Sequence, residues 1–217
     1  MKAIVLGNGR SRLGVSLPFG APWRIYGCNA IYRSQIVSNL IAVDIEMQHE
    51  IYTSGYCKEH TCHFVDWNPM PAQRVYEQVV DTVGMNNIIQ NDHSEDHIVN
   101  IAGKGGKMYV TWLQGEDKIQ AVKSNRMSSG STALQIAASH TNPEVYMFGF
   151  DMDDTNIYTG TDCYPIDSTS LPEWYNEHEL IYRMYPETTF FRVECKMEKS
   201  KANNVKYLTK EEWNEIH

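Results

Sequence analysis

The N-terminal part of the chain alternates short apolar runs with polar residues. Mainly apolar runs occur at residues 3–6, 24–28 and 40–43, and each ends directly in a glycine or a polar residue. Short apolar runs bounded by turn residues are typical of strands buried in a parallel sheet. With short helical connections, such as one at 30–38, the pattern predicts the start of a doubly wound α/β fold.

The remaining pattern predicts that this fold is interrupted once and then resumes. Strand-like runs at 97–102 and 107–113 flank the glycine-rich residues 103–106, which indicates a β-hairpin, and a run at 118–122 extends it as a meander. We therefore expect an antiparallel insertion at about residues 85–124. The other expected elements are strands at 63–67, 144–148 and 188–193, helices at 71–83, 133–139 and 172–185, and a terminal helix opened by a capping box of Thr209 and Glu212.

The sequence thus predicts one Rossmann-like domain over residues 1–217, with a mainly parallel sheet, the hairpin insertion and a long lid loop. The lid is the polar and aromatic segment 152–172, because a loop of this length in a compact domain often covers an active site. Tyr158 and Tyr164 lie in this segment, and they favour a lid that becomes ordered on a ligand.

Composition narrows the classes of partner. The 217 residues carry a formal net charge of -8, and the 19 Lys and Arg residues are scattered, which argues against binding along a nucleic-acid backbone. The sequence shows no apolar run that would span a bilayer and no signal-like leader, and its five irregularly spaced cysteines do not indicate a disulfide framework. We expect a cytoplasmic protein that binds a small molecule, has no membrane partner and is free to form a homo-oligomer.

A Gly-X-Gly turn directly follows the first apolar run. Gly7, Asn8 and Gly9 form this turn, and such a turn lets backbone N–H groups approach a phosphate. The dinucleotide-binding motif has a third glycine where this chain has Arg12, and an acidic residue where it has Asn29. These differences disfavour a nicotinamide cofactor and are compatible with another nucleotide. A tight turn that binds no ligand is the alternative.

Polar groups are expected at two places along the edge of the sheet. Asn8, Asn29 and Asp44 each follow one of the first three strands, so we expect them at the same carboxyl edge. Amide side chains both donate and accept, which suits a base, a ribose or a phosphate. Residues 128–132, SSGST, precede a predicted helix, where hydroxyls and free N–H groups suit a phosphate or a carboxylate, with ordinary N-capping as the alternative.

One cysteine and histidine cluster has the donor types of a zinc site. Cys57, His60, Cys62 and His63 form this cluster, but the adjacent Cys62 and His63 do not readily face one ion, and no second paired cluster follows. We therefore predict no metal site.

Four short motifs resemble those of a known group of enzymes. They are GNGRS at 7–11, CN at 28–29, RMSSG at 126–130 and GFD at 149–151. In this order they are similar to motifs of the bacterial sialyltransferases that use CMP-sialic acid, and of related Rossmann-like proteins that include archaeal hydroxymethylpterin diphosphokinases. Similar sequences also occur in phages and in marine sources.

The resemblance implies a role in ligand binding for each matched residue. The implied contacts are Asn8, Gly9 and Asn29 with the nucleotide ribose and base, Arg126 near the donor, Ser128, Ser129 and Gly130 with a phosphate or sugar carboxylate, and Gly149 with Asp151 near the cytosine or ribose. Gly7 belongs to the same turn as Asn8.

The catalytic base departs from the pattern of the family. The sialyltransferases use a lid histidine to accept the proton of the acceptor, whereas the corresponding place here holds Asp167. Asp153 and His178 are the alternatives, although His178 lies within a predicted helix and is interpreted as a half-exposed residue. Tyr158 and Tyr164 would steady the departing phosphate, but their spacing differs from the family, and Asp153 stands where the first tyrosine is expected.

These features predict a protein that binds a nucleotide or a nucleotide-sugar, and most directly a glycosyltransferase-like enzyme. A CMP-type donor would pass its sugar to an unidentified acceptor without a metal or a covalently bound cofactor. A second prediction is pyrophosphate transfer from ATP to a pterin-like alcohol, with Mg²⁺ held by Asp44, Asp151, Asp153 and Asp154. A third is a non-catalytic nucleotide-binding protein, such as a phage accessory protein.

Overall fold

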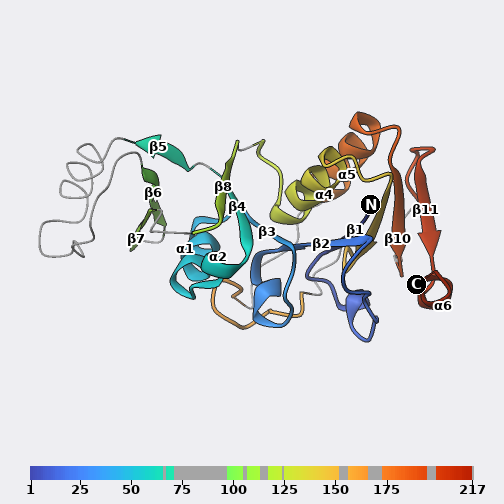
Figure 1. Cartoon of the computed structure of the whole chain (residues 1–217), viewed down its shortest axis with the longest axis horizontal. Helices are drawn as coiled ribbons and strands as arrows, with labels where there is room; N and C mark the ends of the chain where they lie inside the picture. The colour runs from blue at the N-terminus through green and yellow to red at the C-terminus, as the bar shows by residue number, and fades with distance from the viewer. Residues whose placement is uncertain are drawn as a thin grey trace, which may run out of the picture. The chain divides into compact units, whose positions relative to one another are not determined.

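The computed structural model describes residues 1–65, 67–70, 97–104, 107–112, 117–123, 125–151, 156–165, 173–194 and 199–216. The contacts within the chain divide it into two compact units. The first unit joins Met1–Ile41 to Asn125–His217, and the second unit is Ala42–Ser124. Figure 1 shows the helices and strands of both units.

Six parallel strands form the sheet of the first unit. They are β1 (Lys2–Leu6), β2 (Trp23–Cys28), β3 (Asn39–Ala42), β9 (Glu144–Phe148), β10 (Thr189–Val193) and β11 (Val205–Leu208). Their order is β3-β2-β1-β9-β10-β11, and every pairing is parallel. This is the strand order of the Rossmann fold, in which strands are added first on one side of β1 and then on the other. The structure therefore confirms the expected Rossmann-like α/β fold.

The strands predicted best are those whose side chains are buried on both faces. In β1, Ala3, Ile4, Val5 and Leu6 are at most 1% exposed. β9 spans the residues expected from its apolar run, and β10 begins one residue later than expected. The sequence pattern did not predict β11, because most of its residues are only half buried and its polar and apolar positions do not form a run.

Short 3-10 helices follow β1, where a short helix or a turn was expected, and β2, where a short helix at 30–38 was expected. They are η1 (Arg10–Arg12) and η2 (Asn29–Arg33). A Cβ atom on Gly27 would lie 3.0 Å from the side chains of Ile31 and Val37, so the segment after β2 packs directly on the backbone of that strand. This close contact explains why the connection is a single 3-10 helix rather than the longer helix that the sequence predicts.

Helices cover both faces of the sheet in the first unit. α4 (Ser129–Ser139) and α5 (Glu173–Met184) pack against each other on one face, and α6 (Lys210–Asn214) packs on the opposite face (Figure 1). The predicted capping box opens α6, since the Thr209 hydroxyl accepts from the Glu212 N–H and the Glu212 carboxylate accepts from the Thr209 N–H. Among the described residues, no helix is both long and apolar enough to cross a membrane.

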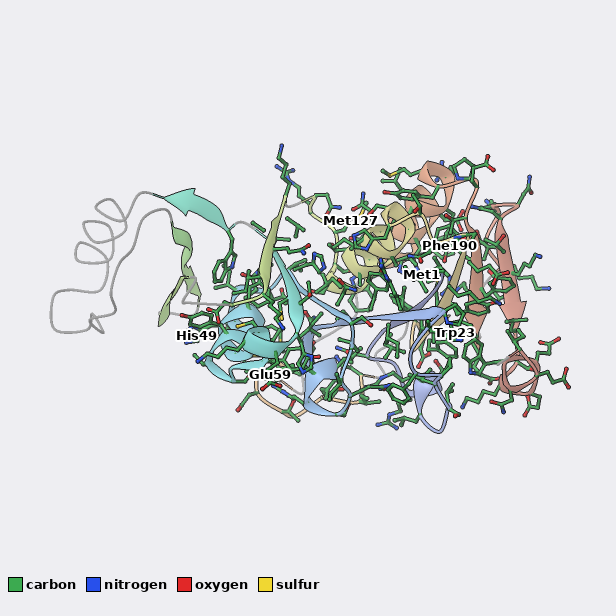
Figure 2. The ribbon with its side chains drawn as sticks, viewed as in Figure 1. Met1, Trp23, His49, Glu59, Met127 and Phe190 are labelled. Carbon is green, nitrogen blue, oxygen red and sulfur yellow. The ribbon has the colours of Figure 1, made fainter. Side chains whose placement is uncertain are left out.

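Trp213 attaches α6 to the sheet. Its side chain is fully buried, and its ring centroid lies 5.0–5.4 Å from those of Tyr146, Phe148 and Trp23, the last of which is labelled in Figure 2. Its indole N–H donates to the carbonyl oxygen of Ser16 at 3.0 Å. One side chain therefore links α6, the sheet and the loop after η1.

The described residues of the second unit form two helices and five strands. They are α1 (Ile45–Thr53), α2 (Tyr56–Glu59), β4 (Thr61–Val65), β5 (Asn68–Met70), β6 (His97–Lys104), β7 (Lys107–Trp112) and β8 (Ile119–Val122). β4 and β8 form a parallel pair, and β5, β6 and β7 form an antiparallel sheet. β6 and β7 lie where the sequence predicts a hairpin, whereas the turn expected between them and the helix expected at 71–83 lie outside the described residues.

The third strand of the expected meander is placed differently by the structure. β8 pairs in parallel with β4 and is not an extension of the antiparallel sheet, so this part of the prediction is wrong. Two backbone hydrogen bonds show why: the Cys62 N–H donates to the Lys118 carbonyl at 2.9 Å, and the Lys118 N–H donates to the Cys57 carbonyl at 2.7 Å. The residue before β8 is thus held by α2 and β4.

Replacing Trp213 with alanine should destabilise the protein by about 3–5 kcal/mol, because it removes the buried contact between α6 and the sheet. Trp213→Phe is the matched control, which keeps an aromatic ring but loses the hydrogen bond to Ser16 and should cost about 1–2 kcal/mol. Urea unfolding followed by circular dichroism measures both values. Equal losses for the two variants would show that ring packing does not hold α6 in place.

Candidate functional site

The carboxyl ends of β1 and β9 meet at two glycines. The Gly7 N–H donates to the Phe148 carbonyl at 2.7 Å, and the Gly9 N–H donates to the Gly149 carbonyl at 2.8 Å. A Cβ atom on Gly7 would lie 2.3 Å from the Gly149 oxygen, and one on Gly149, whose φ is 71°, would lie 2.6 Å from the Gly7 oxygen. The approach of two backbones therefore requires these glycines, whether or not a phosphate binds beside them.

Asp151 holds the turn that follows β1. Its carboxylate accepts from the Ser11 N–H at 2.9 Å and from the Ser11 hydroxyl. A Cβ atom on Gly9 would lie 2.5 Å from the same carboxylate, so Gly9 also permits this contact. Asp151 was expected to meet the cytosine or ribose of a ligand, and in the structure its carboxylate binds the start of η1.

The described part of the expected lid, residues 156–165, is attached to the turn after β1. The Ile157 N–H donates to the Asn8 carbonyl at 2.9 Å, and the Asn8 side-chain amide donates to the Tyr164 hydroxyl at 2.9 Å. The Cys28 thiol lies 3.9 Å from the Asn8 side-chain oxygen. The structure thus brings together Asn8 and Tyr164, two residues that the sequence assigned to the site.

Tyr158 lies between two arginine side chains. The guanidinium carbons of Arg12 and Arg33 are 5.8 and 6.0 Å from the centre of its ring. Its hydroxyl accepts from Arg12 Nη2 at 2.7 Å and lies 2.8 Å from the Ser34 hydroxyl. Arg33 also donates to the hydroxyl of Thr161 at 2.7 Å. We call Arg12, Arg33, Ser34 and Tyr158 the tyrosine–arginine cluster.

Sequence analysis missed the arginines and the serine of this cluster. Arg12 was noted only because it stands where the dinucleotide motif has glycine, and Arg33 and Ser34 were not considered. Their positions along the chain could have indicated them, because Arg10, Arg12 and Arg33 all lie in the short connections that follow β1 and β2.

Two buried polar atoms near these connections have no hydrogen-bond partner in the described part of the chain. They are the side-chain oxygen of Asn29 and Nε of Arg12. Asn29 directly follows β2 and has a φ of 52°, a left-handed conformation that asparagine tolerates better than most residues. Buried polar atoms are nearly always paired in folded proteins, so an acceptor and a donor remain for a ligand at the carboxyl edge.

A carboxylate of the chain itself binds the N-terminus of α4. The Ser128 N–H donates to Glu177 Oε2 at 3.1 Å, and the Ser128 hydroxyl lies 2.9 Å from the same oxygen. Ser129 is 3% exposed, and a Cβ atom on Gly130 would lie 3.1 Å from the Phe150 ring. These contacts favour the N-capping alternative, while the phosphate or sugar carboxylate expected at Ser128, Ser129 and Gly130 stays a prediction.

His178 is buried, so its interpretation as a half-exposed residue is wrong. The side chain is 1% exposed, and its ring lies 5.2 Å from that of Phe150 and 6.2 Å from that of Tyr182. Burial, together with the nearby positive charge of Arg192, lowers the pKa of His178 well below its ordinary value. The imidazole is therefore neutral at pH 7. Because it is buried, it does not reach an acceptor substrate that enters from solvent, as a catalytic base would.

The other predicted site residues lie in three different places. Asp153 and Asp167 are outside the described residues. Asp44 is exposed and is the N-cap residue of α1 in the second unit. Arg126 lies two residues before the Ser128 cap, with an exposed side chain and a φ of 61°.

The cysteines of the second unit are buried, and Cys57 lies beside Asp117. The Cys57 thiol lies 3.9 Å from an Asp117 carboxylate oxygen, and burial raises the pKa of Cys57 to about 12 and also raises that of Cys62. Both are thus neutral thiols at pH 7. Within the described part of the chain, no group of three or more His, Cys, Asp or Glu residues is placed to hold a metal ion.

Gly149→Ala should destabilise the protein more than Gly14→Ala. Both glycines have positive φ angles, 71° and 75°, so each alanine carries a similar backbone strain of about 1–2 kcal/mol. Only the Gly149 variant also forces a Cβ atom against backbone, which adds about 1–3 kcal/mol, because nothing lies within 4 Å of a Cβ on Gly14. Denaturant unfolding measures both, and equal losses would contradict the close approach of β1 and β9.

His178→Gln should make the protein less sensitive to acid. Because the pKa of His178 is lowered in the folded protein, the unfolded chain binds more protons as pH falls below about 6.5, and stability is lost there. The variant lacks this contribution, so its unfolding free energy should fall less between pH 7 and pH 5. His49 and His140, whose pKa values are also lowered, are present in both proteins. If unfolding free energy falls equally with pH in the wild-type protein and in His178→Gln, the burial of a neutral His178 is contradicted.

Comparisons with known proteins add no further assignment. Searches against protein-family models, curated proteins and solved structures give no significant match.

Proposed function

We propose that the first unit binds a nucleotide or a nucleotide-activated sugar at the carboxyl edge of its sheet. The observation that carries the proposal is the strand order, in which β2 lies on one side of β1 and β9 on the other. In open α/β sheets, ligands bind outside the carboxyl ends of the strands at such a reversal of strand order. The turn at Gly7, Asn8 and Gly9 lies at this point.

The charges and polar groups beside the reversal suit a nucleotide. Arg12 and Arg33 supply positive charge in a chain whose formal net charge is -8, which favours binding of phosphate groups. The unpaired side-chain oxygen of Asn29 suits a donor group on a base or ribose. Tyr158 is 8% exposed, so it serves mainly to fix the two arginines.

The resemblance to the CMP-sialic acid sialyltransferases extends this proposal to sugar transfer. In that reaction an acceptor oxygen displaces the nucleotide phosphate at the anomeric carbon, and the developing charge on the phosphate needs hydrogen-bond donors and cations. Tyr164, whose hydroxyl accepts from Asn8, is suited to this role, and the buried Tyr158 would act through Arg12 and Arg33, which it contacts. Asp153 or Asp167 would take the acceptor proton.

A thermal-shift screen against CMP, CDP, UDP, GDP, ATP and NAD, each with and without Mg²⁺, tests binding. A ligand at 100 times its dissociation constant adds about 2.7 kcal/mol of stability, which is a readily measured rise in melting temperature. We expect a cytidine-selective rise that needs no metal. No response to any of the six compounds would contradict the proposal.

Variants locate the binding site. Arg12→Gln with Arg33→Gln should weaken nucleotide affinity at least tenfold, or about 1.4 kcal/mol, because both cations are lost. Arg24→Gln is the matched control, because Arg24 lies near the amino end of β2, away from the proposed site at the carboxyl edge. The nucleotide affinity of this variant should match that of the wild-type protein. Isothermal titration measures all three proteins. Equal weakening in both variants would place the nucleotide elsewhere.

Turnover separates an enzyme from a binding protein. If CMP binds, incubation with CMP-sugars should release CMP faster than the spontaneous reaction, and nuclear magnetic resonance can follow the release. Tight binding with no acceleration for any donor would support the non-catalytic alternative.

A further inference from the structure

Arg192 is a buried cation beneath α5. It is the fourth residue of β10 and is 1% exposed. Alternate residues of a strand share a face, so Arg192 lies on the same face as Phe190, whose ring is 4.8 Å from that of Tyr182 in α5 (Figure 2). Arg192 therefore points under α5 at the carboxyl end of β10.

The guanidinium of Arg192 uses little of its hydrogen-bonding capacity. Nη2 donates to the carbonyl oxygen of Phe150 at 3.1 Å, directly after β9 and its glycine. Nε and Nη1 are buried and have no hydrogen-bond partner among the residues that the structure describes. A buried guanidinium is normally paired with an anion, because removing its charge from water is unfavourable unless another charge compensates it.

The neighbouring residues of α5 do not provide the compensating charge. His178 lies next to Arg192 and is neutral, and its Nδ1 is also buried without a partner. Glu177 and Glu179 flank His178 in the sequence, but the Glu177 carboxylate binds Ser128 and the Glu179 carboxylate accepts from the Ser200 hydroxyl. Two guanidinium nitrogens thus remain without an acceptor among the described residues, as does His178 Nδ1 in the tautomer that carries its proton there.

We propose that Arg192 anchors a binding site for a small oxyanion, a carboxylate or a phosphate, beneath α5 at the carboxyl ends of β9 and β10. The oxyanion accepts from the guanidinium, and His178 provides a second polar contact through Nδ1. This site does not rest on the proposed nucleotide function. The residue after η1, Leu13, accepts from Lys210 of α6 at 3.2 Å, so the connection that carries Arg12 lies toward the opposite face of the sheet.

The test is the melting temperature of the full chain in increasing inorganic phosphate or acetate, with sodium chloride holding the ionic strength constant. The wild-type protein should show a saturable rise in at least one series, and the series that responds identifies the oxyanion. Arg192→Met, which keeps an apolar stem but removes the charge, should lose the saturable rise. Arg183→Met is the matched control, because Arg183 is an exposed residue of α5, and it should respond as the wild-type protein does.

Two results would overturn the proposal. Phosphate stabilises many proteins by exclusion from their surface, so an equal rise in the wild-type protein and in Arg192→Met would show only this general effect. Loss of the response in Arg12→Gln, with its retention in Arg192→Met, would place the oxyanion in the tyrosine–arginine cluster.

A second measurement keeps the proposal testable if Arg192→Met does not fold. The ¹⁵Nε resonance of Arg192 in the wild-type protein, assigned by its loss in Arg192→Lys, should shift saturably on titration with the oxyanion. An unchanged resonance with both phosphate and acetate would overturn the proposal.

Discussion

The close approach of two backbones at the centre of the sheet determines the geometry of the candidate site. Gly7 and Gly149 end β1 and β9, and a Cβ atom on either would lie within 2.6 Å of the other's carbonyl oxygen. The approach also places the Gly9 N–H on the Gly149 carbonyl and the Asp151 carboxylate on Ser11. Because η1 begins at this point, the position of Arg12 and its contact with Tyr158 follow from it.

Three arginines, Arg12, Arg33 and Arg192, lie near the carboxyl ends of strands in the first unit of a chain that is acidic overall. One group of cations surrounds Tyr158, and another cation, Arg192, is buried beneath α5. Both places contain buried nitrogen atoms without partners, at Arg12 and at Arg192. In contrast, the carboxylates of Glu177 and Asp151 are bound by N–H and hydroxyl groups of the chain. This distribution favours the binding of anionic ligands, such as a nucleotide or a small oxyanion.

The sequence predicted those features that depend on local pattern. β1 and β9 were predicted well because an apolar run is sufficient evidence for a strand buried on both faces. The partner strand of β8 was not predicted, because the residue pattern at 118–122 is compatible with a parallel or an antiparallel pair. The backbone hydrogen bonds of Lys118 with Cys57 and Cys62 fix the parallel pairing. His178 was misjudged for the same reason, since Phe150 and Arg192, which lie beside it, come from other parts of the chain than its own helix.

The central claim is that the carboxyl edge of the first unit binds a nucleotide. Amide chemical-shift mapping with saturating CMP tests it most directly, because it reports the location of the ligand as well as its presence. The account predicts the largest shifts at residues 7–12, 29–34 and 156–165, with smaller changes at the amino ends of the strands. Shifts confined to the second unit, or the absence of any shift with CMP and the other nucleotides, would contradict it.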